Sequence, residues 1–159
     1  MNRNSALATA AILLVLALST VYAEVVHSSS CPASTKTVNC TIHEVRVDPC
    51  REAAENKPCL LKRGHVASIS FDYTAQFTGN TLSSRAYWAS EIADLPFLGM
   101  PLDACSSTVC PTVPGERQTY TVNLPISKKF PARTYDLKWK LWNEQDEGCC
   151  FMFPIKLQK

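Results

Sequence analysis

Apolar and polar residues alternate along most of the chain after residue 65, and this period of two limits what the chain can fold into. In segment 65–78 the apolar positions are Ala67, Ile69, Phe71, Tyr73, Ala75 and Phe77. Successive side chains of a strand point to opposite faces, so this segment is predicted to be a half-buried β-strand. Segments 117–126, 134–145 and 150–158 repeat the pattern, and 41–50 and 81–92 show it more weakly.

Six or seven such strands, each with one apolar face, predict an all-β domain in which two sheets pack face to face. No segment after residue 23 has a sustained apolar stripe at helical spacing. The strand pattern gives these candidates for the inner faces: Ile69, Phe71, Tyr73, Phe77, Tyr120, Val122, Leu137, Trp139, Leu141, Phe151 and Phe153. They fit either an ordinary core or the lining of an internal binding site.

The first 23 residues are predicted to be a signal peptide, which leaves residues 24–159 as one domain. Arg3 precedes an apolar run from Ala6 to Leu18, and small residues stand where a signal peptidase would cleave. Removing this segment takes away one basic residue and no acidic one, so the net charge falls from +2 to +1. A nearly neutral chain has no basic stripe for nucleic acid.

Eight cysteines in a secreted chain of this size predict four disulfides. Zinc would require paired Cys-x-x-Cys or Cys/His spacings, and the sequence has none. Cys50 pairs most simply with Cys59, and Cys105 with Cys110, because each pair brackets a short turn. Cys31 and Cys40 then pair with Cys149 and Cys150, which as strand neighbours should reach different partners. The residues alone do not decide between the two ways of joining these four.

The segment "LPFLGMPLDACSSTVCP", residues 95–111, combines large apolar side chains with prolines and a glycine. Proline excludes it from the interior of a helix or of a central strand. A tightly closed sandwich has no use for Phe97 and Leu98 on such a loop. A sandwich that opens at one edge can use them to cover the opening.

Taken together, these segments resemble the ML (MD-2-related lipid-recognition) domain family, and within it the Niemann–Pick type C2-like secreted proteins. "IHEVRVDPC", "SISFDYTAQF", "TYTVNLPISKKFPARTYDLKWKLWNEQ" and "CFMFPIKL" are similar to successive strands of the family. The Pro-rich loop with its small disulfide, residues 95–111, is the most specific match. The resemblance departs from the sterol carriers at "AYWASEI", where a Val-His-Gly element is usual, and in the prolines around Phe97.

The resemblance implies an immunoglobulin-like β-sandwich of two antiparallel sheets, about seven strands in all, with a hydrophobic cavity between them. It places Phe97, Ile126 and Phe130 at the entrance, and we expect Leu95, Leu98 and Met100 of the loop to contact the ligand. It also implies the disulfides Cys40–Cys150, Cys50–Cys59 and Cys105–Cys110, with Cys31–Cys149 as a fourth. The alternative joins Cys31 to Cys150 and Cys40 to Cys149.

The predicted function is therefore that of a secreted, monomeric carrier of a fatty acid, sterol or lipid-like semiochemical, with the lysosomal lumen as another location. Its predicted partners are that apolar small molecule and a membrane receptor that accepts it. The alternative is a protein-interaction module or co-receptor that recognises a lipid-bearing partner. No catalytic residues, metal or cofactor are expected, because no Gly-x-Ser-x-Gly elbow occurs and every cysteine is committed to a bridge. Asn39-Cys40-Thr41 is a candidate glycosylation site.

Overall fold

Strands make up nearly all of the regular structure in this computed structural model, which describes residues 23–32 and 40–159. The strands are β1 Glu24–Val26, β2 Ser29–Ser30, β3 Cys40–Asp48, β4 Cys59–Lys62, β5 Val66–Ala75, β6 Ser83–Trp88, β7 Leu95–Pro96, β8 Arg117–Pro125, β9 Thr134–Trp142 and β10 Gly148–Gln158. One short 3₁₀ helix, η1 Arg51–Glu55, lies between β3 and β4. The signal-peptide prediction and the glycosylation prediction at Asn39 concern residues that, apart from Ala23, lie outside the described ranges.

The six long strands coincide with the six predicted segments, and the all-β prediction is confirmed. Strands β1, β2, β4 and β7 were not predicted, because two to four residues are too few to show an alternation. Within the described residues, no helix is long and apolar enough to span a membrane.

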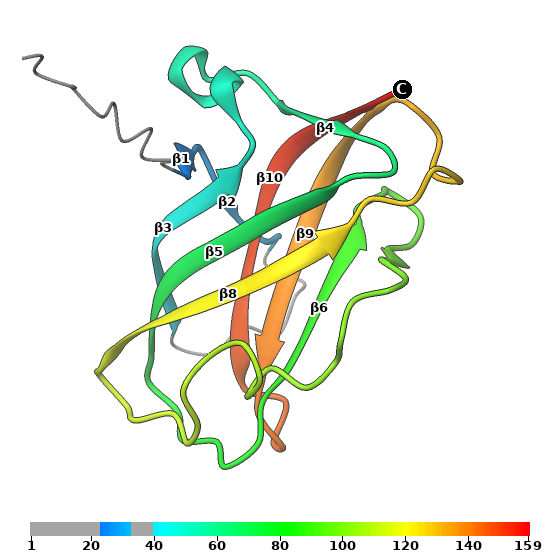
Figure 1. Ribbon diagram of the computed structural model, residues 1–159. Coiled ribbons are helices and arrows are strands. Elements are labelled where there is room, and N and C mark those ends of the chain that lie inside the picture. The colour runs from blue at the N-terminus through cyan, green and yellow to red at the C-terminus, as the bar shows by residue number, and fades with distance from the viewer. Residues whose placement is uncertain (1–22, 33–39) are drawn as a thin grey trace, which may run out of the picture.

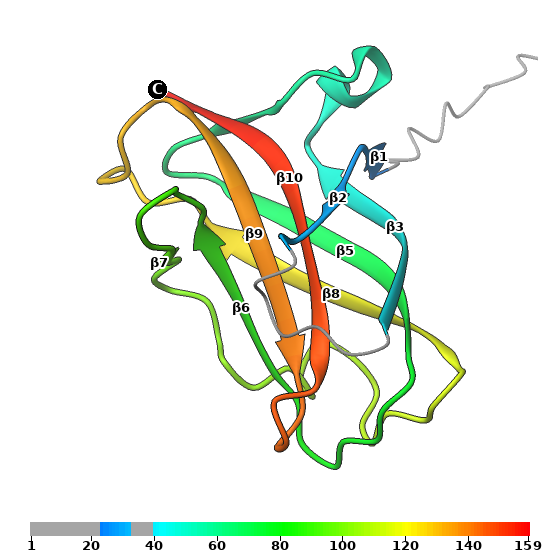
Figure 2. The same cartoon turned by 180° about the vertical axis from the view of Figure 1, so that it is seen from behind.

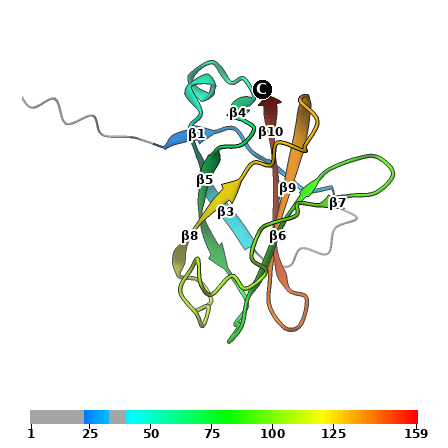
Figure 3. The same ribbon diagram turned by 45° about the vertical axis from the view of Figure 1, so that its right-hand side comes forward.

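The strands form two sheets that pack face to face (Figure 1). One sheet has the order β1-β3-β5-β8, and the other has the order β2-β10-β9-β6-β7, with β4 also paired to β10. Neighbours are antiparallel except β4 and β10, which run parallel. Figure 3 shows the sheets nearly edge-on, with β8 and β6 on the side nearer the viewer and the β6–β7 connection projecting outward.

The residues that the alternation predicted to face inward form the packed interior. All eleven predicted inward residues are buried, at 7% exposure or less. The Phe71 ring stacks on Tyr120 at 4.9 Å between centroids and meets the edge of Phe151 at 4.8 Å, so rings from both sheets interlock. Aromatic pairs of this kind add to the stabilisation from burial alone.

Four disulfides are present, and two of them differ from the pairing implied by the resemblance. Cys50–Cys59 and Cys105–Cys110 are confirmed. The predicted pairs Cys40–Cys150 and Cys31–Cys149 are wrong, because the structure joins Cys31 to Cys150 and Cys40 to Cys149.

The register of β10 gives the reason for this pairing. Cys149 lies on the inner face with Phe151 and Phe153, so it meets Cys40 at the start of β3 in the opposite sheet. Cys150 faces the other way. Because Ser30 of β2 pairs with Phe151, the next residue of the β2 segment, Cys31, comes beside Cys150. Figure 2 shows β2 lying along β10.

On the outer face of the four-stranded sheet, Asp72 joins three strands through charged hydrogen bonds. Arg46 of β3 donates to it at 2.5 Å, Arg117 of β8 at 2.7 Å and Thr119 at 2.8 Å. The Arg46 guanidinium, helped by Arg117 and Thr119, outweighs burial and holds the pKa of Asp72 far below its usual range. The Asp72 carboxylate is only 13% exposed, so water screens these pairs weakly.

We expect Asp72→Asn to lower the free energy of unfolding at neutral pH by about 1–3 kcal/mol, the usual size for hydrogen bonds to a charged group. Because the pKa of Asp72 is lowered in the folded state, its stabilisation is complete above the unfolded-state value near 4 and is lost as the pH falls below it. Urea unfolding from pH 7 down to pH 2 should show a smaller acid destabilisation in the variant than in the wild type. The matched control is Glu116→Gln, since Glu116 is exposed and forms no ion pair among the described residues. Equal pH profiles for the two variants would contradict this role of Asp72.

Candidate functional site

The two long edges of the sandwich are closed in different ways. At the β3 and β10 side, the Cys40–Cys149 disulfide joins the sheets covalently. At the β6 and β8 side, the half of the edge near Ser84, which is lower in Figure 1, is bridged by the loop that holds Cys105 and Cys110. Ser84 N donates to Leu102 O at 2.8 Å, and Thr121 N of β8 donates to Ser107 O at 2.9 Å.

Aromatic rings close the upper half of that second edge. Trp88 of β6 lies 5.1 Å from Phe97, 5.1 Å from Phe130 and 4.4 Å from Tyr135, measured between ring centroids. Phe97 and Phe130 meet edge to face at 5.2 Å, so rings from the β7 segment and from the β8–β9 loop touch each other. We call these four residues the aromatic mouth. Among the described residues, no hydrogen bond joins segment 88–100 to segment 122–133.

Backbone contacts hold each side of the aromatic mouth in place. Phe97 N donates to Ala86 O of β6 at 2.8 Å. The following turn passes close to the end of β8, since a methyl group on Gly99 would lie 3.9 Å from Cγ of Pro125. Gly99 has a φ of +92°, which a side chain would disfavour. Across the edge, Arg63 donates to the carbonyl oxygen of Phe130 at 2.9 Å and so fixes the β8–β9 loop.

A half-open hollow of about 310 Å³ lies at the end of the sandwich, beneath the turn between β4 and β5. Its apolar wall includes Leu61, Ala67 and Ile126, and its rim carries Lys62 and His65. Ile126 N donates to His65 O, and Gly64 N donates to Ile126 O, so the turn is tied to the end of β8. Three residues of the β8–β9 loop separate Ile126, which lines the hollow, from Phe130 of the aromatic mouth.

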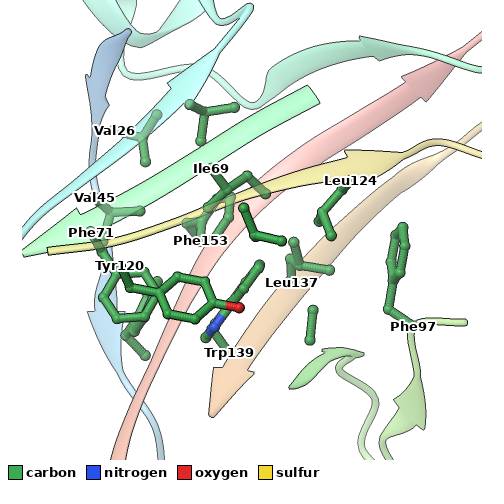
Figure 4. Close-up of a cluster of buried hydrophobic side chains, with 14 of the residues drawn as sticks. Val26, Val45, Ile69, Phe71, Phe97, Tyr120, Leu124, Leu137, Trp139 and Phe153 are labelled. Atoms are coloured by element: carbon green, nitrogen blue, oxygen red, sulfur yellow. The ribbon is translucent and has the colours of Figure 1, made fainter. Parts of the chain in front are cut away.

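Behind the aromatic mouth, the inner face of β6 changes from large to small side chains. Trp88, Ala86 and Ser84 are its successive inward positions, and Ala86 and Ser84 are fully buried. Figure 4 shows the side chains beyond them, with Phe97 standing apart at the edge and Tyr120 and Trp139 deeper between the sheets. The interior is therefore apolar and continuous from the edge inward, with few polar atoms.

The structure brings together most of the residues predicted for the site. Phe97 and Ile126 are buried, and Phe130 and Met100 are partly buried against the core. Leu95 and Leu98, expected to contact the ligand, are instead 62% and 72% exposed on the outer side of the β7 segment. The inward side chain of this segment is Phe97, which follows the two-residue strand β7 and is 2% exposed against Trp88 and Phe130.

Two members of the aromatic mouth, Trp88 and Tyr135, were not predicted to be site residues. Both lie at the end of a strand, so they could be taken for ordinary members of the strand pattern. No sequence pattern distinguishes Trp88 and Tyr135 from core residues, because the fold alone brings their rings together.

The fold and the apolar interior define a class: a disulfide-bridged two-sheet sandwich with part of one edge closed by aromatic side chains. Residues 25–157 match the model of the ML domain family. The chain belongs to the ML domain family. It is 42% identical to the MD-2-related lipid-recognition protein of Manduca sexta over 76% of this chain and 78% of that one. It is 24% identical to the NPC intracellular cholesterol transporter 2 of Danio rerio, over 80% and 88%.

Solved structures show the same fold at low sequence identity. The Niemann-Pick type C2 protein from Japanese carpenter ant matches with a TM-score of 0.71 and 20% identity, covering 82% of this chain and 98% of that one. Chicken MD-1, solved in complex with lipid IVa, matches with a TM-score of 0.52 and 17% identity over 85% and 96%. These likenesses place the chain among immunoglobulin-like ML sandwiches.

Proposed function

We propose that this protein is a secreted carrier that binds an apolar molecule between its two sheets and transports it. The observation that supports this most strongly is the closure of the upper β6–β8 edge by four aromatic side chains, with no backbone hydrogen bond across it in the described residues. Side chains can move aside without breaking a sheet. The names of relatives, lipid-recognition protein and cholesterol transporter, are consistent with this class of ligand.

Burial of apolar surface supplies the binding energy in this proposal. A ligand that loses about 400 Å² of apolar surface gains on the order of 10 kcal/mol before ordering costs. The ligand class is a fatty acid, a sterol or a similar lipid, and no catalytic step is proposed. Four disulfides are typical of oxidising compartments, which agrees with secretion or with the lysosomal lumen.

Two measurements test the carrier. The purified protein is extracted with organic solvent, and the extract is analysed by mass spectrometry for a stoichiometric lipid. The delipidated protein is then titrated with N-phenyl-1-naphthylamine, a neutral probe that fluoresces in apolar surroundings. We expect saturable binding of about one probe per chain. Absence of both a co-purified lipid and probe binding would contradict the carrier function.

A second candidate function, a protein-interaction module, is favoured by one surface feature. Ile92, Leu95 and Leu98 are 99%, 62% and 72% exposed on the β6–β7 segment and the turn after it, next to the aromatic mouth. Exposed apolar groups gathered in this way are found where proteins meet partners. This candidate predicts that the chain binds a protein partner when it carries no lipid, and that the two measurements above find neither a co-purified lipid nor probe binding.

A further inference from the structure

Lys138 is a nearly buried cation on the outer face of the six-stranded sheet. It lies in β9 between the inward residues Leu137 and Trp139, and only 11% of its side chain is exposed. A lysine is rarely buried to this extent without a charged partner, because removing the ammonium group from water is costly. Lys138 Nζ donates to Asp94 Oδ2 at 2.7 Å, and the Asp94 side chain is 23% exposed. Among the described residues, neither side chain forms another ion pair.

Asp94 is the last residue of the connection between β6 and β7, residues 89–94. Figure 3 shows this connection projecting beyond β6. At its start, the Ala89 amide donates to a carbonyl oxygen of β9 at 2.9 Å. Further along, Ser90 Oγ bonds only to the backbone three residues on. Within the described part of the chain, the pair with Lys138 is therefore the only hydrogen bond that ties the rest of the connection to the sheet.

The strand that follows Asp94 is held weakly. β7, Leu95–Pro96, pairs only with the end of β6, and Pro96 has no amide hydrogen to donate. Phe97 of the aromatic mouth comes next, and its amide donates to Ala86 O of β6. Segments with few hydrogen bonds open at low cost. Because Asp94 is three residues from Phe97, holding Asp94 against β9 also holds Phe97 in the aromatic mouth.

No acid lies opposite Lys138 on the neighbouring strands. The residues in register with it are Tyr87 of β6 and Met152 of β10, and neither is charged. Along β9, the same face carries Asp136 on one side and a second cation, Lys140, on the other, each about 7 Å away. Release of the β6–β7 connection thus leaves a nearly buried cation unpaired, and this cost opposes release.

We infer that Asp94 and Lys138 are positioning residues that form a latch: their ion pair holds the β6–β7 connection against β9 and so sets the rate at which a ligand passes the aromatic mouth. This inference rests on the proposed carrier function. The latch lies on the outer face of the sheet, where it touches nothing held between the sheets. It is therefore the same in the empty and the loaded protein, so it controls the rates of entry and exit and leaves the affinity unchanged.

The test measures entry and affinity separately with N-phenyl-1-naphthylamine. Stopped-flow mixing over a range of probe concentrations gives the entry rate constant, equilibrium titration gives Kd, and their product gives the exit rate constant. We expect Lys138→Met, which keeps an unbranched side chain, to raise entry and exit together about fivefold to tenfold, the value of one partly exposed charged hydrogen bond. Its Kd should stay within about twofold of the wild type.

The matched control is Lys140→Met, the same substitution two residues along the same face of β9. Lys140 forms no ion pair among the described residues, and its amine lies 5.3 Å from the centroid of the Tyr87 ring. This variant should keep the rates of the wild type. Asp94→Asn should accelerate both rates as Lys138→Met does. The double variant Asp94→Asn with Lys138→Met should be no faster than either single one, because the pair is already broken.

Near-ultraviolet circular dichroism establishes that each variant is folded, and Asp94→Asn carries the test if Lys138→Met does not fold. Rates within twofold of the wild type in the folded single variants would overturn the latch. A faster exit with an unchanged entry would also overturn it, since that pattern indicates a deformed binding site and not a gate. Equal acceleration by Lys140→Met would assign the effect to the charge of β9 in general and would overturn it too. Failure of the wild type to bind the probe would instead refute the carrier function on which the inference rests.

Discussion

Removing either of the two long disulfides alone is expected to lower the free energy of unfolding by about 3 kcal/mol, and removing both by about 7–8 kcal/mol. The reason is that the bridges are nested. Cys31–Cys150 spans 119 residues and encloses Cys40–Cys149, which spans 109. While one remains, the chain still has its long closed loop, and the missing bridge releases only a small ring of about ten residues.

Denaturant unfolding of three variants measures this difference. One variant removes the first bridge (Cys31→Ser with Cys150→Ser), one removes the second (Cys40→Ser with Cys149→Ser), and the third carries all four substitutions. The matched control removes Cys105–Cys110, which spans five residues and should cost about 2 kcal/mol whichever long bridge is present. If the fourfold replacement cost no more than the sum of the two single losses, the loop-closure explanation would be wrong. Complete unfolding of a variant that lacks only one long bridge would also contradict the loop-closure explanation.

Phe97→Asp is expected to abolish loading of the apolar probe, whereas Leu98→Asp should leave loading within about twofold of the wild type. Phe97 is 2% exposed and touches both Trp88 and Phe130, so a carboxylate there is unpaired and surrounded by rings. Burying such a charge is costly, and the mouth must instead admit water. Leu98 is the adjacent residue but is 72% exposed, so the same new charge remains solvated.

Titration of both variants with N-phenyl-1-naphthylamine gives the comparison, with near-ultraviolet circular dichroism to confirm that each is folded. Phe97→Leu serves as a conservative variant that keeps an apolar seal, and it should retain most of the loading. If folded Phe97→Asp loaded as well as the wild type, the aromatic mouth would not be the route to the interior. Equal loss in Leu98→Asp would attribute the effect to net charge and not to position.

The strands and the core could be predicted from the sequence because burial on one face leaves a period of two. Phe71, Trp139 and Phe153 are identified as inward-facing by their alternation alone, and each is buried. β3 shows the limit of this reasoning, since a bulge between Ile42 and Glu44 breaks the alternation before it resumes at Val45. Such an irregularity is visible only when the partner strand is known.

The disulfide pairing and the composition of the mouth could not be predicted in the same way. The choice between Cys149 and Cys150 depends on which face of β10 meets which sheet, and β2, which decides it, has only two residues. Trp88, Phe97, Phe130 and Tyr135 come from separate segments that the fold alone brings together.

One edge of the sandwich is closed by aromatic rings and the other by a disulfide, so side-chain motion at the first edge does not require the strands to open. Side-chain rotation and loop motion take picoseconds to microseconds, while local unfolding of paired strands takes microseconds to seconds and can approach global unfolding in cost. A molecule held behind such a seal could leave without any amide of β5 or β10 losing its hydrogen-bond partner. Stability of the fold and rapid exchange of a bound molecule would then not compete, and amide hydrogen exchange in those central strands should be the same with and without that molecule.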